Sequence, residues 1–211
     1  MKIGIFGGTF NPIHNSHIYI AEEFREKLGL ERMLIVPTYT PPHKTAEGVA
    51  DPAHRLAMCR LAIRDLPGFS VSEYEIGNED KSYTYKTLHH LWEQNPGAEL
   101  YLIMGSDMFL TVQSWKKPEE IYKMAVLCAA QREHDGLALM STHKKVLERH
   151  GARCMLIDIT ARPLSSTLIR DMIRIGEDPS SMVHPDVWAY IRHNRLYQEE
   201  RSFMDAGEKN A

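Results

Sequence analysis

The chain opens with a short apolar run that passes directly into two glycines. Residues 2–17 read KIGIFGGTFNPIHNSH, and the apolar residues at their start have the character of a buried strand. We expect this strand to break at Gly7 and Gly8, where a backbone without a Cβ can turn sharply or approach a ligand closely. Asn11-Pro12 is typical of a turn. The stretch therefore predicts a strand, a glycine break and a helix start in immediate succession.

Two histidines lie close to this predicted helix start. If the helix begins near Ile13, His14 and His17 share one face beside its first turn. The first turn of a helix carries unpaired N–H groups and the positive end of the helix dipole, which favour an anion. Either feature alone is common in ordinary βα turns and surface helices. Their coincidence after the first strand predicts a phosphate site, because open α/β sheets bind ligands at the carboxyl ends of their strands.

Short apolar strands and amphipathic helices alternate along the rest of the chain. The expected strands are 33–36, 69–76, 100–104, 125–130 and 154–159, and the expected helices are 13–28, 52–67, 82–92, 137–150, one capped by Ser165 or Ser166, and 184–191. This order predicts an α/β fold: a doubly wound, Rossmann-like parallel sheet with helices on both faces and a small C-terminal helical part. We expect one domain over residues 1–197 and a polar, frayed tail over 198–211.

Composition excludes several classes of protein. The net charge of −3 comes without a basic stripe, which argues against a nucleic-acid polymer as partner. The three cysteines are far apart in apolar settings, which favours reduced core residues, and no apolar run approaches membrane-spanning length. We therefore expect a cytoplasmic protein without a membrane partner. The dinucleotide motif G-x-G-x-x-G and the P-loop motif are both absent from the sequence.

Several polar residues follow other predicted strands. Lys44, in the loop Pro41-Pro42-His43-Lys44, could bring an ammonium group to the same anion, although a surface loop stiffened by prolines is the alternative. Asp107 could cap a helix or bind ribose hydroxyls through its two oxygens. Trp115 could pack or could stack on a ring.

A second anion-binding pattern follows the last predicted strand, in the segment LSSTLIR at residues 164–170. A serine cap places hydroxyl and amide donors at a helix start, and Arg170 adds a guanidinium one turn later. An ordinary capped helix with a surface arginine is the alternative.

The ordered set of these motifs resembles the nucleotidylyltransferase superfamily and, within it, the bacterial nicotinate-mononucleotide adenylyltransferases. The resemblance spans residues 1–197 and is carried by the H-x-x-H pair, Gly7-Gly8-Thr9-Phe10-Asn11-Pro12, Pro41-Pro42-His43-Lys44, Ser82-Tyr83-Thr84, Gly105-Ser106-Asp107, Trp115, the Ser-Ser-Thr-x-Ile-Arg segment and His184-Pro185. It implies transfer of the adenylyl group of ATP to nicotinate mononucleotide, which gives deamido-NAD and pyrophosphate, with Mg²⁺ carried mainly by the phosphates.

The resemblance also implies roles for individual residues. The implied catalytic residues are His14, His17, Lys44 and Arg170; the implied ATP-binding residues are Gly7, Gly8, Thr9, Phe10, Ser166 and Thr167; the implied nicotinate-mononucleotide-binding residues are Tyr83, Thr84, Asp107 and Trp115. No protein ligand to a metal is implied. Ser16 departs from the glycine that the family usually has before the second histidine, and the basic residue common before Ser-Tyr-Thr is replaced within residues 78–81, which offer Lys81 alone.

The expected chemistry is a direct in-line attack of the acceptor phosphate on the α-phosphorus, without a covalent enzyme intermediate. Alternatives are a preference for nicotinamide mononucleotide, a phosphopantetheine adenylyltransferase, a glycerol-phosphate cytidylyltransferase, or a catalytically inert nucleotide-binding regulator. The aromatic elements favour a pyridine nucleotide over the second and third. The sequence leaves the oligomeric state open, a homo-oligomer included.

Overall fold

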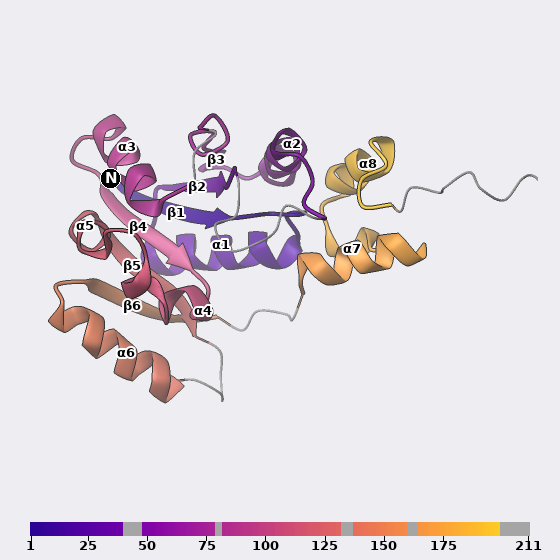
Figure 1. The fold of residues 1–211 in the computed structure, drawn as a ribbon. Coiled ribbons are helices and arrows are strands. Elements are labelled where there is room, and N and C mark those ends of the chain that lie inside the picture. Colours follow the sequence, from indigo (N-terminus) through magenta and orange to yellow (C-terminus); the bar gives the residue numbers. More distant parts are fainter. Residues whose placement is uncertain (40–47, 79–81, 132–136, 160–163, 199–211) are drawn as a thin grey trace, which may run out of the picture.

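A computed structural model describes residues 1–39, 48–78, 82–131, 137–159 and 164–198 (Figure 1). Within these residues, the strands are β1 (Lys2–Gly8), β2 (Arg32–Pro37), β3 (Phe69–Val71), β4 (Glu99–Met104), β5 (Ala125–Gln131) and β6 (Arg153–Asp158). The α-helices are α1 (Asn15–Leu28), α2 (Pro52–Ile63), α3 (Thr84–Gln94), α4 (Ser106–Phe109), α5 (Pro118–Met124), α6 (Leu137–Arg149), α7 (Ser166–Ile175) and α8 (Pro185–His193), with short 3₁₀ turns at Val112–Ser114 and Ser180–Met182.

The strands form one parallel sheet in the order β3-β2-β1-β4-β5-β6. The chain winds outward from β1 in one direction and, after crossing back, outward from β4 in the other. This is the strand order of a doubly wound Rossmann-like fold, and the predicted fold class is confirmed. β1 and β4 are neighbours at the point where the winding direction changes.

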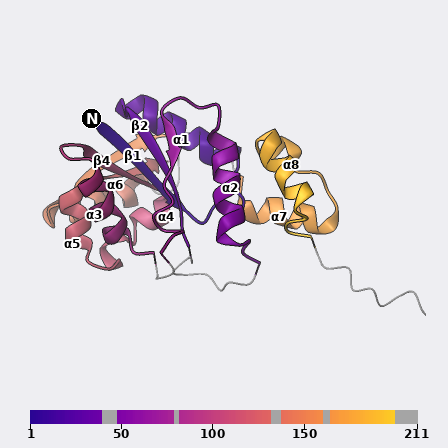
Figure 2. The same ribbon diagram turned by 90° about the horizontal axis from the view of Figure 1, so that it is seen from above.

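Successive residues of the central strands pack on opposite faces of the sheet. Phe6, Ile35 and Ile103 belong to a core cluster that also contains apolar residues of α1, α2, α7 and α8. Ile5 and Leu102 belong to a second cluster, which is completed by α3, α4, α5 and α6. Helices therefore cover both faces, and Figure 2 shows α7 and α8 at one end of the molecule, beyond α2.

Local sequence signals explain several helix ends. The Asp51 carboxylate accepts a hydrogen bond from the N–H of Ala53 at 2.8 Å, with Pro52 as the first residue of α2, as predicted. Ser165, one of the two serines considered, caps α7 by accepting from the N–H of Leu168 at 3.1 Å. α7 ends at Ile175, and Gly176 caps it with a φ of 83°, which favours glycine.

Several predicted boundaries were wrong. The helix expected over residues 52–67 ends at Ile63. β1 does not break at Gly7 and Gly8 but continues through both glycines, because the main chain of β2 pairs with them without needing side chains. α1 begins at Asn15 rather than near Ile13, since His14 occupies the extended capping position before it. The strand expected over residues 69–76 ends at Val71, and the chain then turns back toward α3.

None of the helices in the described part of the chain combines the length and apolarity needed to cross a membrane. The three cysteines are free and buried. Burial raises the pKa of Cys128 to about 12 and that of Cys154 to about 11, so both thiols stay protonated in the core. Of the predicted tail, 198–211, residues 199–211 lie outside the described residues.

Candidate active site

The candidate site lies where the chain leaves the carboxyl ends of β1 and β4. Because these two strands are parallel neighbours, the segments that follow them meet at the same edge of the sheet. Residues 9–14 follow β1 and lead into α1, while Gly105 follows β4 and precedes α4. This is the position at which doubly wound sheets bind ligands.

The two histidines predicted to share a face are in direct contact. His14 is the capping residue of α1 and His17 is the third residue of the helix. Their rings are stacked, with centroids 3.6 Å apart and planes inclined by 21°. The main-chain N–H of His14 donates to Nδ1 of His17 at 3.3 Å. Since Nδ1 accepts this bond, the neutral ring of His17 carries its proton on Nε2 and can donate from there.

Burial keeps both histidines uncharged at neutral pH. His14 is 5% exposed, and burial lowers its pKa to about 4. Burial, and secondarily the neighbouring His14, holds the pKa of His17 well below its usual range. The Nδ1 atom of His14 is buried and has no hydrogen-bond partner among the described residues. The pair therefore offers neutral polar atoms rather than a fixed positive charge.

Aromatic packing fixes the position of His17. The ring of Phe10 lies edge-on to His17, with centroids 5.1 Å apart, and edge-on to Phe6 at 5.6 Å. Phe10 is 3% exposed and has a φ of 48°, which is unusual for a residue with a side chain. Its ring belongs to the core beneath the histidines, so a ligand could reach only its main chain.

Gly7 and Gly8 differ in what surrounds them. A Cβ on Gly8 would lie 2.9 Å from the ring of Phe10, so the glycine is needed for packing. A Cβ on Gly7 would meet nothing closer than a main-chain oxygen at 4.0 Å. Packing within the described residues therefore does not require a glycine at position 7, which leaves room there for a ligand.

The second predicted anion site is joined directly to the first. The Ser166 hydroxyl donates to the carbonyl oxygen of Pro12 at 2.8 Å, and Nη1 of Arg170 donates to the carbonyl oxygen of Asn11 at 2.8 Å. Nη2 of Arg170 also donates to the Thr167 hydroxyl at 3.3 Å. Two segments more than 150 residues apart thus bring the starts of α1 and α7 together.

Asn11 organises this junction, although the sequence indicated no more for it than a turn and a place in the motif after the first strand. It is 5% exposed; its Nδ2 donates to the Gly48 carbonyl at 3.0 Å, and its Oδ1 accepts from the N–H of Ala50 at 3.0 Å. The same oxygen accepts from the Tyr197 hydroxyl at 2.9 Å. Arg55, whose Nη1 donates to the carbonyl oxygen of Thr9 at 2.8 Å, was also not predicted. Lys44 lies outside the described residues.

The residues predicted for the pyridine nucleotide lie around the start of α3. Tyr83 occupies the position before this helix and Thr84 is its first residue. Trp115 is half-buried against the core on the α3 side of the sheet. The Lys117 ammonium lies 4.7 Å from the ring centre of Tyr85, so the segment after Trp115 and the first turn of α3 are neighbours.

Asp107 lies in α4 and is exposed. The cap position of α4 is occupied by Gly105 and not by Asp107. Within the described part of the chain the Asp107 carboxylate makes no hydrogen bond or ion pair. The reading of Asp107 as a helix cap was therefore wrong, and its carboxylate is available to a ligand.

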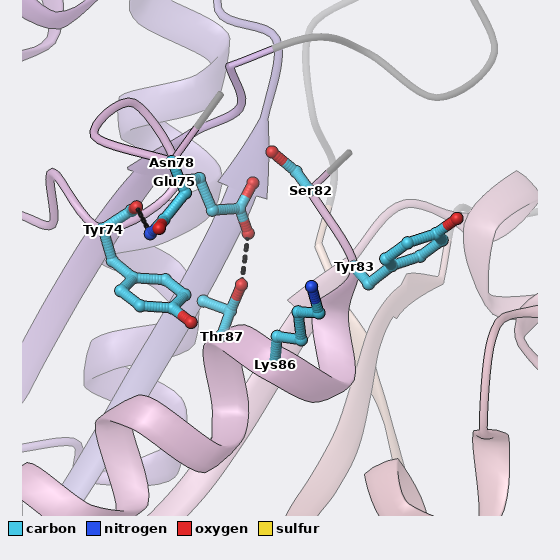
Figure 3. A pocket seen from close by; sticks show the side chains of 7 residues that line it. All are labelled: Tyr74, Glu75, Asn78, Ser82, Tyr83, Lys86 and Thr87. Atoms are coloured by element: carbon cyan, nitrogen blue, oxygen red, sulfur yellow. Dashed lines mark hydrogen bonds between the residues drawn. The ribbon is translucent and has the colours of Figure 1, made fainter. Parts of the chain in front are cut away.

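A pocket opens beside the start of α3 (Figure 3). It is lined by Tyr74, Glu75, Asn78, Ser82, Tyr83, Lys86 and Thr87. The Thr87 hydroxyl donates to Oε1 of Glu75 at 2.6 Å, and burial raises the pKa of this carboxyl group. The side-chain amide of Asn78 donates to the carbonyl oxygen of Tyr74 at 2.6 Å.

The described residues contain no group of three His, Cys, Asp or Glu side chains arranged to hold a metal ion. Ser16, the departure from the family pattern, is 8% exposed within the first turn of α1.

Comparison with known proteins identifies the class of enzyme to which the chain belongs. Residues 5–172 match the family model described as cytidylyltransferase-like, so the chain is a nucleotidyltransferase of the cytidylyltransferase-like family. A protein of Streptococcus pyogenes serotype M18 named "Probable nicotinate-nucleotide adenylyltransferase" is 35% identical over 197 residues, covering 93% of this chain and 89% of the relative. A protein of the same name from Shewanella sp. (strain W3-18-1) is 38% identical over 214 residues, covering 93% and 99%. The chain belongs to the nicotinate-nucleotide adenylyltransferase family.

Solved structures of low sequence identity share the fold. The Plasmodium falciparum nicotinic acid mononucleotide adenylyltransferase complexed with NaAD superposes with a TM-score of 0.75 at 20% identity, covering 93% of this chain and 97% of that one. The same enzyme complexed with APC gives a TM-score of 0.73, covering 93% and 96%.

Proposed function

We propose that this chain transfers the adenylyl group of ATP to nicotinate mononucleotide, which gives deamido-NAD and pyrophosphate. The observation that carries the proposal is the junction of α1 and α7. Ser166 and Arg170 bind the main chain just before the histidine pair, so two helix N-termini and a guanidinium converge on one place. Such an arrangement suits a triphosphate, and relatives with this activity in their names cover most of the chain.

The residues act by binding and orienting two anions rather than by forming a covalent intermediate. The acceptor phosphate has a second pKa of about 6 and needs no strong base to become a nucleophile at neutral pH. The Nε2–H of His17 and the guanidinium of Arg170 donate to phosphate oxygens as charge moves toward the leaving pyrophosphate. Lys44 adds an ammonium group, and Thr167 and the main chain of residues 7–10 complete the ATP contacts. Mg²⁺, when bound with the phosphates, supplies charge neutralisation.

The start of α3 would read the nicotinate carboxylate. The N–H groups of Thr84 and Tyr85 belong to the first turn and make no hydrogen bond within the described residues. Trp115 would stack on the pyridine ring and Asp107 would accept from ribose hydroxyls. Main-chain donors favour a carboxylate over an uncharged amide, so we propose that nicotinate mononucleotide is preferred to nicotinamide mononucleotide.

Pyrophosphate release with ATP and Mg²⁺ tests the proposal when nicotinate mononucleotide, nicotinamide mononucleotide and phosphopantetheine are supplied in turn. We expect release with nicotinate mononucleotide to exceed release with its amide by a wide margin. Equal rates with the acid and the amide would refute the proposed reading of the carboxylate. ATP binding without pyrophosphate release from any acceptor would instead identify a nucleotide-binding regulator.

A further inference from the structure

Arg55 is a fully buried charged residue near the start of α2. Its side chain is 0% exposed, and it is the largest of the fully buried side chains. Arginine is seldom buried without a carboxylate partner, because removing its charge from water is costly. Within the described part of the chain Arg55 makes no ion pair, and its guanidinium instead binds main-chain carbonyl groups.

The three carbonyl groups come from three separate segments. Nη1 donates to Thr9 at 2.8 Å, Nη2 donates to Tyr39 at 2.7 Å and Nε donates to Ala50 at 3.0 Å. Thr9 follows β1, Tyr39 follows β2 and Ala50 precedes α2. The rigid fork of one guanidinium therefore joins the carboxyl ends of two neighbouring strands directly behind the candidate phosphate site.

The bond to Thr9 sets the direction of the next N–H group. In a planar trans peptide the C=O and N–H groups point in opposite directions, so the N–H of Phe10 points away from Arg55. This N–H makes no hydrogen bond within the described residues. The carbonyl of Asn11 is held in turn by Arg170. Arginine side chains thus hold the carbonyl groups on either side of Phe10 and leave its N–H available to an anion.

The positive charge of Arg55 also favours binding of an anion at this site. The Arg55 guanidinium is bonded only to neutral carbonyl groups in the described part of the chain, so its positive charge is not cancelled by a bonded carboxylate. Placed behind a site for a polyanion, this charge stabilises the bound state more than the free state.

We propose that Arg55 is a positioning residue for ATP: it orients the Thr9-Phe10 peptide so that the N–H of Phe10 donates to a phosphate oxygen. Arg55 does not touch the substrate itself. The inference rests on the proposed function only in taking the anion to be ATP, and ATP binding can be measured without an acceptor nucleotide.

Two substitutions separate geometry from charge. Arg55→Lys retains the charge but loses the fork that reaches three carbonyl groups, and Arg55→Met removes both. Arg60→Met is the matched control, because Arg60 lies on the same helix, is exposed and pairs with Glu73. Folding is checked by circular dichroism, ATP affinity by calorimetry, and kcat and KM by pyrophosphate release.

We expect Arg55→Lys to bind ATP about ten- to a hundredfold more weakly, the range for hydrogen bonds to charged groups, with a matching loss of kcat/KM for ATP. The KM for the acceptor should stay near the wild-type value, and Arg60→Met should bind ATP as the wild type does. A folded Arg55→Lys enzyme with wild-type ATP affinity would overturn the proposal. Failure of the wild type to release pyrophosphate would refute the proposed function without affecting this result.

A measurement on the wild type covers the case in which neither variant folds. Thr9-Phe10 is the one Thr-Phe pair in the sequence, so labelling threonine carbonyls with ¹³C and phenylalanine amides with ¹⁵N selects a single resonance. We expect the Phe10 amide proton to shift downfield when ATP is added. A resonance that ATP leaves unchanged would overturn the proposal regardless of the variants.

Discussion

The histidine pair makes the stability of the protein depend on pH in a calculable way. The pKa of His14 is about 4 in the folded protein against 6.5 when unperturbed. The unfolded chain binds a proton on His14 more tightly than the folded protein does, so protonation favours unfolding. The stability that depends on a neutral His14 is therefore complete above pH 6.5 and is lost as the pH falls through 4. For His14 alone the loss amounts to about 2 kcal/mol of unfolding free energy by pH 5 and about 3 kcal/mol at full protonation. His17, whose pKa is also lowered, adds to the loss.

Urea unfolding followed by circular dichroism between pH 8 and pH 5 measures this effect. We expect His14→Leu, which cannot titrate, to flatten the curve by about 2 kcal/mol over that interval, whatever its stability at pH 8. The exposed His193 provides a matched control, His193→Asn. Wild-type protein as stable at pH 5 as at pH 8, or a His14→Leu variant that retains the full slope, would refute the reasoning.

Three further predictions concern the same edge of the sheet. Gly8→Ala should lower the free energy of unfolding by about 1–3 kcal/mol, because the added methyl group overpacks against Phe10. Gly7→Ala should unfold like the wild type in a denaturation experiment but bind ATP more weakly in calorimetry. His17→Ala should lower kcat about a hundred- to a thousandfold with the fold intact, and a folded variant with near-wild-type turnover would contradict the role. Burial raises the pKa of Glu75, so ionisation of this carboxyl group at high pH lowers the stability of the wild type. The stability of Glu75→Gln minus that of the wild type should therefore be larger at pH 8 than at pH 4. An equal difference at the two pH values would contradict the prediction.

The sequence was sufficient to predict the fold class, because each apolar run and each helix boundary signal is local. Asp51 and Pro52 specify the start of α2, and Ser165 specifies the start of α7, through contacts within three residues. The H-x-x-H spacing likewise predicted that His14 and His17 share a face. Spacing could not predict that the two rings stack and that His17 Nδ1 accepts a hydrogen bond from the main chain of His14. This contact depends on packing against Phe10.

The missed residues act through long-range contacts. Arg55 lies among the apolar positions of a helix and, by its sequence alone, is typical of a solvated charge. Its three partners are main-chain carbonyl groups 5, 16 and 46 residues away, and a carbonyl group has no sequence signature. Asn11 was missed for the same reason. The end of β1 was misplaced because glycines in a central strand can pair through their main chain as other residues do.

The hydrogen bond between Asn11 and Tyr197 has a consequence for how the enzyme is made. The two residues are separated by 186 positions, and Asn11 also binds Arg170 through its carbonyl oxygen. When all six strands have left the ribosome, Arg170 and Tyr197, which bind the loop after β1, have therefore not yet been translated or have not yet emerged. The proposed ATP site therefore lacks one contact of Asn11 until residue 197 has emerged, so a nascent chain should form the parallel sheet before it acquires full nucleotide affinity.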